Sequence, residues 1–161
     1  MREALNSTKN LILIFVLIWF MFTFFLGIKM APNDDMSPRI SAGDILLYYR
    51  LNKTPTAQKV VVLKKNDTFY VGRVVAVGGD TVEITKDSNL VINGNTVIEE
   101  RIFYKTSYFE GFVDYPVTLK DGEYFILVDK RVDGEDSRYY GVVSQNEIKG
   151  VVIGQFRRSY I

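Results

Sequence analysis

The sequence predicts an all-β domain preceded by one N-terminal transmembrane helix, and three observations carry this prediction. An uncharged apolar segment of eighteen residues lies near the N-terminus. The rest of the chain holds many short apolar runs separated by Gly-rich turns, and no helical period persists there for three turns. Aromatic residues make up 14% of the chain and β-branched residues are common, a mix that favours strands.

The apolar segment, residues 11–28, reads LILIFVLIWFMFTFFLGI. As a helix it would be about 27 Å long, close to the thickness of a bilayer core, and it lacks the polar stripe of a soluble helix. Arg2 and Lys9 precede it and Asp34 and Asp35 follow it, so the positive-inside rule places the N-terminus in the cytoplasm. The expected organisation is a cytoplasmic N-terminus 1–10, a single-pass anchor 11–28 in the cell membrane, and an extracellular domain 29–161.

A cleaved secretory signal peptide is the alternative interpretation of this segment. Such peptides have an apolar stretch of about 7–15 residues that ends in small residues with A-x-A spacing. The stretch here is longer, and a cut after Ala31 would put Lys29 where a small residue is needed. The pattern therefore favours an uncleaved anchor.

The outer domain contains a series of strand-length apolar runs. Asn93-Gly94 interrupts one of them and is the pair that favours a two-residue type I′ hairpin. Gly78-Gly79-Asp80 and Asp121-Gly122 are further turn signals. This spacing predicts an antiparallel β domain, either partly closed or built from two sheets. The expected strands are residues 45–49, 59–63, 70–77, 90–98, 123–128 and 150–156.

Composition excludes several classes of function. The chain has no Cys and no His, which removes disulfides, thiol catalysis, a His general base and the usual zinc sites. A net charge of +1 gives no electrostatic sign of nucleic-acid binding. Gly78-Gly79 lacks the spacing of a phosphate-binding loop, so we expect no nucleotide and no cofactor.

Three local patterns occur in order behind the apolar segment. They are residues 32–40 (PNDDMSPRI) followed by Gly43-Asp44, residues 72–80 (GRVVAVGGD), and residues 129–141 (DKRVDGEDSRYYG). Together they resemble the type I signal peptidases, which are membrane-anchored serine peptidases with a Ser-Lys dyad that remove signal peptides from exported proteins. The resemblance covers nearly the whole chain and implies a signal-peptidase-like β domain.

The resemblance also shows where the chain departs from the family. The nucleophilic Ser corresponds to Asp35 and the dyad Lys to Gly72. Asn33 stands at the position of the Ser that contributes to the oxyanion hole, and Gly134 at that of a Ser that orients the Lys. The positions that agree with the family are Met36, Pro38, Gly43, Asp44, Arg73, Asp80, Asp129, Arg131, Asp136, Ser137 and Arg138.

These replacements remove the chemistry of a serine peptidase. Gly72 has no amine to act as a base, and the guanidinium of Arg73 does not release its proton near neutral pH. Asp35 could attack a carbonyl only to form an anhydride, which is a poor route for an amide. We therefore expect no competent catalytic residue and predict an inactive homologue.

Two unconventional catalytic routes stay open at this point. Ser37 could act as a shifted nucleophile, although beside Pro38 its hydroxyl suits a turn. Asp35 could share a proton with Asp129 or Asp136, as in an aspartic peptidase. The resemblance instead implies that both of those carboxylates pair with Arg131, Arg138 or backbone, in a structural network with Ser137.

We expect a non-catalytic accessory factor or chaperone, tethered to the membrane, that binds exported polypeptides in a groove. The candidate groove residues are Asp35, Met36, Pro38, Gly72 and Arg73. Loss of both dyad residues resembles the signal-peptidase-like proteins encoded beside pilin genes in streptococci, which implies pilin subunits as partners and a sortase in the same pathway. An active signal peptidase and a generic membrane-anchored β scaffold are the alternative hypotheses.

Overall fold

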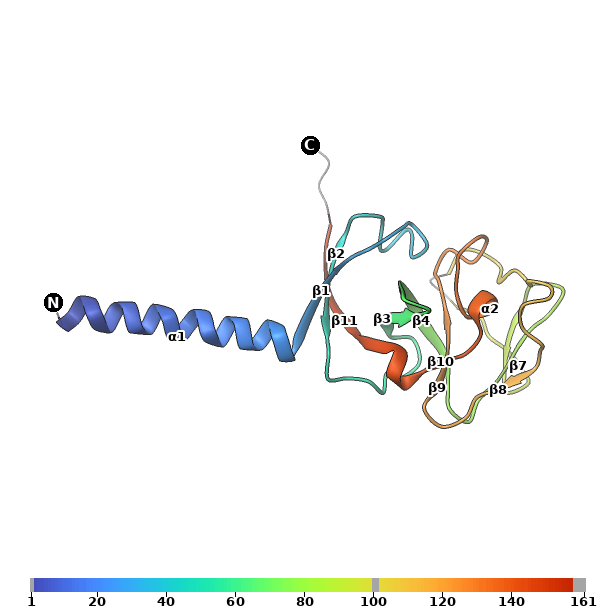
Figure 1. Ribbon diagram of the computed structural model, residues 1–161. Coiled ribbons are helices and arrows are strands. Elements are labelled where there is room, and N and C mark those ends of the chain that lie inside the picture. Colours follow the sequence, from blue (N-terminus) through green and yellow to red (C-terminus); the bar gives the residue numbers. More distant parts are fainter. Residues whose placement is uncertain (1, 100–101, 158–161) are drawn as a thin grey trace.

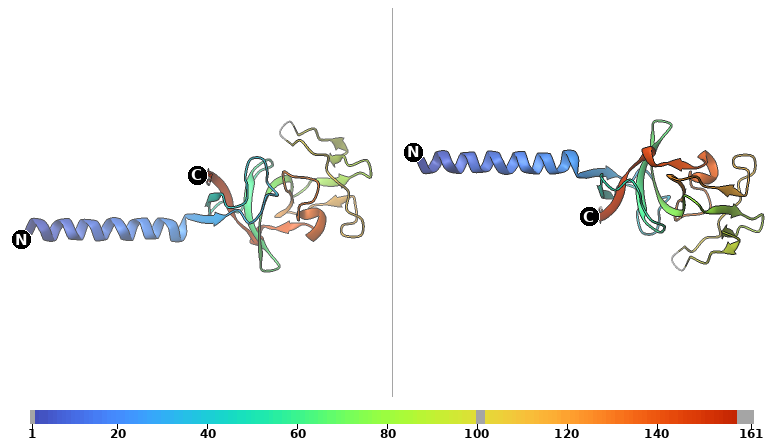
Figure 2. Two further views of the ribbon diagram at one scale, coloured as in Figure 1. Left: turned by 90° about the horizontal axis from the view of Figure 1, so that it is seen from above. Right: turned by 90° about the horizontal axis from the view of Figure 1, so that it is seen from below.

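The computed structural model describes residues 2–99 and 102–157, and its β strands form two antiparallel sheets. Figure 1 shows a long N-terminal helix, α1 (Arg2–Phe24), that extends away from the β domain. Both sheets lie beyond its C-terminal end, and the smaller sheet lies farthest from the helix (Figure 2). The chain is therefore predominantly β, and its strands form two sheets.

The helix ends four residues before the end of the expected anchor. Phe24 is its last residue, and Leu26–Met30 forms strand β1, which pairs with β2 (Ile45–Tyr49). Residues 26–30 are mostly apolar, like the helix before them. Their pairing with β2 shows that they form a strand and do not continue the helix. Among the described residues, no helix is both long and apolar enough to cross a membrane.

The larger sheet contains seven strands in the order β1-β2-β11-β3-β4-β9-β10. Its second longest strand, β11 (Ile148–Phe156), lies between β2 and β3. The C-terminal strand therefore joins the two N-terminal strands to the rest of the sheet. Its remaining strands are β3 (Val60–Lys65), β4 (Thr68–Val77), β9 (Glu123–Leu127) and β10 (Val143–Ser144).

The smaller sheet has the order β7-β6-β5-β8. Asn93 and Gly94 both adopt positive φ, 53° and 78°, as a type I′ turn requires, and they join two of its strands. The strands are β5 (Thr81–Ile84), β6 (Leu90–Ile92), β7 (Asn95–Thr96) and β8 (Val117–Thr118).

Each expected strand run contains a strand, and the structure adds elements that the sequence did not indicate. β1, β5, β8 and β10 fall outside the expected runs, as do the short helix α2 (Ser137–Tyr140) and the 3₁₀ turn η1 (Gln145–Glu147). β8 and β10 have two residues each, too few for an alternating pattern to be visible.

Apolar side chains form three buried clusters. One packs the segment after β1 against β3 and β4 and includes Met36, Val62, Val71 and Val128. The second lies where β3, β4, β9 and β11 meet, and the third lies between the two sheets. The first cluster places the turn that carries Asp35 directly on the larger sheet, because Met36 is only 2% exposed.

At Gly150 the backbone of a neighbouring strand leaves no room for a side chain. A Cβ there would lie 2.2 Å from the carbonyl oxygen of Tyr49, whereas at Gly154 on the same strand it would lie 3.7 Å from Leu47 Cβ. We expect Gly150→Ala to lower the free energy of unfolding by about 1–3 kcal/mol or more. Gly154→Ala should change it little, and equal effects in chemical denaturation of the two variants would contradict this packing.

Candidate functional site

The turn that carries Asp35 is docked on the loop after β9. The carboxylate of Asp35 accepts a hydrogen bond from Asn33 Nδ2 at 2.7 Å, and its backbone N–H donates to Asn33 Oδ1 at 3.2 Å. The carbonyl of Asp35 accepts from the backbone N–H of Lys130 at 2.8 Å. The first and third sequence patterns therefore meet at Asp35.

Asp35 lies in an environment that disfavours its charge. Partial burial raises its pKa above the ordinary value of 3.8, and hydrogen bonds from the Asn33 side chain and the Glu135 backbone oppose this rise. The negative charges of Asp136 and Glu135 raise it further. The carboxylate is thus held by two donors while facing two other acids.

Gly72 lies inside the larger sheet, where β4 is flanked by β3 and β9. A Cβ at this position would lie 2.5 Å from Ile126 Cγ2 and 3.3 Å from the carbonyl oxygen of Leu127. Gly134 is similarly crowded, since a Cβ there would lie 2.2 Å from Val128 Cγ2. At both glycines a branched side chain of the β9 segment occupies the space in which a side chain would begin.

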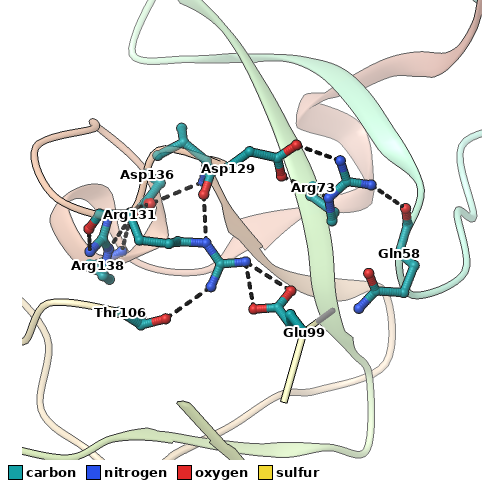
Figure 3. A network of polar contacts seen from close by, with 9 residues as sticks. Gln58, Arg73, Glu99, Thr106, Asp129, Arg131, Asp136 and Arg138 are labelled. Carbon is teal, nitrogen blue, oxygen red and sulfur yellow. Dashed lines mark hydrogen bonds and ion pairs between the residues drawn. The ribbon is translucent and has the colours of Figure 1, made fainter. Parts of the chain in front are cut away.

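Figure 3 shows a network of buried guanidinium groups, and one of them belongs to Arg73, the residue after Gly72. Arg73 forms two hydrogen bonds with the Asp129 carboxylate, at 2.8 and 2.5 Å, and a third from Nη1 to the carbonyl of Gln58. Arg73 is 8% exposed and Asp129 4%. The partner of Asp129 is therefore Arg73, and not Arg131 or Arg138 as the resemblance implied.

Arg131 and Arg138 are fully buried, and each nitrogen of their guanidinium groups donates to at least one acceptor. Arg131 donates to the carbonyl of Val128, to Thr106 Oγ1 and to the carboxylate of Glu99. Arg138 forms two hydrogen bonds with the Asp136 carboxylate, both at 2.8 Å, and Asp136 also accepts from the backbone N–H of Val128 at 3.1 Å.

Ser137 completes the network at the start of α2. Its hydroxyl accepts a hydrogen bond from the backbone N–H of Ile126 at 2.9 Å, which ties the short helix to β9. Asp136 is the N-cap of that helix and accepts from the Arg138 backbone N–H. The five residues expected in a structural network thus lie together around the loop 128–138.

The five candidate groove residues do not share one surface. Met36 and Gly72 are buried in the interior, Pro38 is exposed, and Asp35 is partly buried. Arg73 lines two cavities of about 400 and 240 Å³. Neither cavity was predicted, because the lining residues come from segments distant in the chain, among them Arg39, Gln58, Val97, Glu99, Ile102 and Gln155.

The two acids weighed as partners for Asp35 are engaged elsewhere. Asp129 binds Arg73 and Asp136 binds Arg138, whereas the carboxylate of Asp35 accepts from Asn33 and Glu135. In residues 2–99 and 102–157, no group of three or more His, Cys, Asp and Glu side chains has an arrangement that could hold a metal ion.

Comparison with known proteins identifies similar sequences along almost the whole chain. The family described as "Signal peptidase, peptidase S26" matches residues 4–156. A signal peptidase IB of Staphylococcus aureus is 24% identical over 96% of this chain and 90% of its own length. A probable signal peptidase I-2 of Synechocystis is 27% identical over 83% of this chain, and the match spans 64% of that relative. A crystal structure of a signal peptidase I from Enterococcus faecalis covers 61% of this chain and 96% of its own, with 27% identity and a TM-score of 0.49.

The Asp136–Arg138 pair should be the most sensitive ionic contact in the domain. We expect Asp136→Asn to lower the free energy of unfolding by about 3–5 kcal/mol, because it leaves a buried guanidinium without its counter-charge. Asp87→Asn, on an exposed turn, is the matched control and should leave stability unchanged. Similar unfolding curves for the two variants would show that the buried pair contributes nothing.

The raised pKa of Asp35 predicts a pH-dependent effect on stability. A protonated Asp35 contributes stability that is fully present below the unfolded pKa of 3.8 and is lost as pH rises through the higher folded value. Asp35→Asn stays neutral, so the free energy of unfolding of this variant minus that of the wild type should increase from about pH 3 to about pH 7.

Asp67→Asn provides a control of opposite sign. Its hydrogen bond with Lys64 lowers the pKa of Asp67, so the native carboxylate stabilises the fold above the unfolded pKa. The stability of this variant relative to the wild type should decrease over the same pH range. A parallel pH profile for the two substitutions would contradict the environment described for Asp35.

Proposed function

The chain belongs to the signal peptidase family, peptidase S26, and from this premise we propose that it is a non-catalytic homologue that binds exported polypeptides at the membrane. Pilin subunits are the class of exported polypeptide that we propose, with a sortase acting in the same assembly pathway. The proposed role is that of an accessory factor or chaperone.

The packing at Gly72 carries the non-catalytic part of this proposal. A serine peptidase of this family needs an amine close to its nucleophile, and a glycine offers none. The methyl group Ile126 Cγ2 also occupies the direction in which a side chain of residue 72 would leave the strand. An aspartate at position 35 adds no hydroxyl that an amine could activate.

The positions of the lysine amines support the same conclusion. In the described part of the chain, the lysines that form hydrogen bonds through Nζ donate to backbone carbonyls or carboxylates. Lys53 binds the carbonyls of Ile148 and Lys149, Lys64 binds Asp67, and Lys65 binds Val142 and Glu147. These three amines therefore support the fold or a surface ion pair.

Binding of a polypeptide needs neither dyad residue. Extended peptides bind through backbone hydrogen bonds and pockets for alternate side chains, both of which a β domain provides. The partly buried carboxylate of Asp35 would favour a basic or polar group on the partner, because a desolvated charge is costly without one. This preference gives the proposed site a first element of selectivity.

Membrane attachment through α1 is part of the proposal. Between Leu11 and Phe25 the helix and the residue after it expose large apolar side chains, including Phe15 at 70% and Trp19 at 66%. Such a surface is unfavourable in water and suits a lipid environment. We propose a cytoplasmic N-terminus, with the β domain on the extracellular side.

Two measurements on the full-length chain in detergent test this function. We expect no cleavage of a preprotein that carries a signal peptide, and recovery of exported polypeptides when the chain is used as bait in solubilised membranes. Asp35→Arg should reduce that recovery severalfold, because it reverses the charge that faces the partner, whereas Asp87→Arg on a remote turn should not.

The possible outcomes separate the competing functions. Cleavage that disappears in Asp35→Ala would establish a peptidase and overturn the non-catalytic assignment. An eluate without exported polypeptides would favour the generic scaffold. In a piliated host, deletion of the gene should abolish the ladder of polymerised pilins on an immunoblot, and a normal ladder would remove pilins as the partner.

A further inference from the structure

Two cavities meet at three shared residues on the surface of the larger sheet. The cavities measure about 400 and 240 Å³, and Arg39, Gln58 and Arg73 line both of them. Arg39 follows the turn that carries Asp35, and Gln58 lies just before β3. Val97, Ile98, Glu99 and Ile102 complete the lining of the larger cavity.

Arg39 is fixed through its backbone, whereas its guanidinium has no hydrogen-bond partner among the described residues. Its carbonyl accepts hydrogen bonds from Gln155 Nε2 at 2.6 Å and from Arg157 Nη2 at 3.1 Å. Its side chain is exposed, and the guanidinium donates no hydrogen bond to any residue in the described part of the chain. The position of Arg39 is thus set, and its donors remain available.

Gln58 shows the same separation of backbone and side chain. It adopts a φ of 69°, a value uncommon for a residue other than glycine. Two hydrogen bonds to its own backbone atoms hold this conformation. Its N–H donates to the carbonyl of Val74 at 2.8 Å, and its carbonyl accepts from Arg73 Nη1 at 2.9 Å. The side-chain amide makes no hydrogen bond with the described residues, so it too can bind a ligand.

The charges around the cavities leave a positive excess. Arg73 is paired with Asp129, and Glu99 is paired with Arg131, so these four groups balance. Among the described residues, the other charged groups that line the cavities are Arg39 and Lys59, both cationic. A bound group with a negative charge would therefore complete the site.

The walls of the site are apolar. Val97, Ile98 and Ile102 line the larger cavity, and Ile98 is 89% exposed, while Val60 and Val152 line the smaller one. Small ions bind without such walls, whereas a side chain that flanks an acidic residue in a polypeptide would cover them. The larger cavity has the volume of a ligand pocket for a few residues.

We propose that this site binds a carboxylate-bearing segment of the exported polypeptide. The guanidinium of Arg39 pairs with the carboxylate, the Gln58 amide donates a second hydrogen bond, and Ile98 contacts a neighbouring apolar residue. The inference rests on the proposed function and extends it. Asp35 and Arg39 then select opposite charges, so a bound segment carries a basic or polar group at one and an acid at the other.

Fluorescence anisotropy on the full-length chain in detergent tests the site. The probe is a short labelled peptide with blocked ends and a central Glu-Val-Glu, compared with the same peptide carrying Gln-Val-Gln. We expect the acidic peptide to bind about three- to fivefold more tightly at low salt, the range of an exposed ion pair with favourable geometry. High salt should reduce this preference.

Arg39→Gln should abolish the preference and Arg39→Lys should retain part of it, because an ammonium keeps the charge and loses the planar fork. Lys86→Gln removes one positive charge from an exposed turn outside the cavities and should leave the preference intact. A Gln-Val-Gln peptide with a free C-terminal carboxylate distinguishes a terminal from a side-chain acid.

Each outcome either supports the proposed site for an acidic segment or overturns it. Equal binding of the two blocked peptides, or a preference that persists in Arg39→Gln, would overturn the acidic site while leaving the proposed function standing. Failure of all the peptides to bind would overturn both. Displacement of the acidic peptide by anionic phosphatidylglycerol vesicles in wild type and not in Arg39→Gln would assign the site to a lipid headgroup instead.

Discussion

The ion pair between Asp136 and Arg138 is the constraint on which the arrangement of the site depends. Both side chains are completely buried, and removing two charges from water costs several kcal/mol for each. The cost is offset because the Asp136 carboxylate accepts from Arg138 and from the Val128 backbone, while Arg138 also donates to the carbonyl of Arg131. So many mutual bonds fix the path of residues 128–138 within narrow limits.

That fixed loop organises two surfaces at once. Through Lys130 it holds the carbonyl of Asp35, and through Arg131 it holds Thr106 and Glu99, of which Glu99 lines the larger cavity. Asp129, at the start of the loop, orients Arg73 between Gln58 and the network. The groups proposed to contact a polypeptide therefore sit on a rigid base, although most of them come from surface turns. This arrangement suits recognition, for which donors must be positioned before the ligand arrives.

The sequence predicted those parts of the fold that local chemistry determines. Asn93-Gly94 predicted a hairpin because few other residue pairs accept two positive φ angles. The longer strands were predicted from runs of β-branched and aromatic residues. The features that the sequence did not predict all depend on contacts between residues distant in the chain. β1 looked like more of the apolar helix until β2 paired with it, and Asp129 could not be assigned to Arg73 rather than to nearer arginines. Arg39 lies in the first of the three patterns and Gln58 in none, so only the folded chain shows that they line the same cavities.

The close contact between Gly72 and Ile126 also bears on whether an amine could be introduced at residue 72. The first side-chain carbon of a lysine introduced at residue 72 would lie 2.5 Å from the methyl group of Ile126. Close packing in the sheet leaves little room for either group to move. Trimming Ile126 first would open a void in the second apolar cluster. Either order passes through a less stable form, and the two changes are non-additive because the residues touch. Packing alone therefore favours glycine at this position, whatever the domain binds.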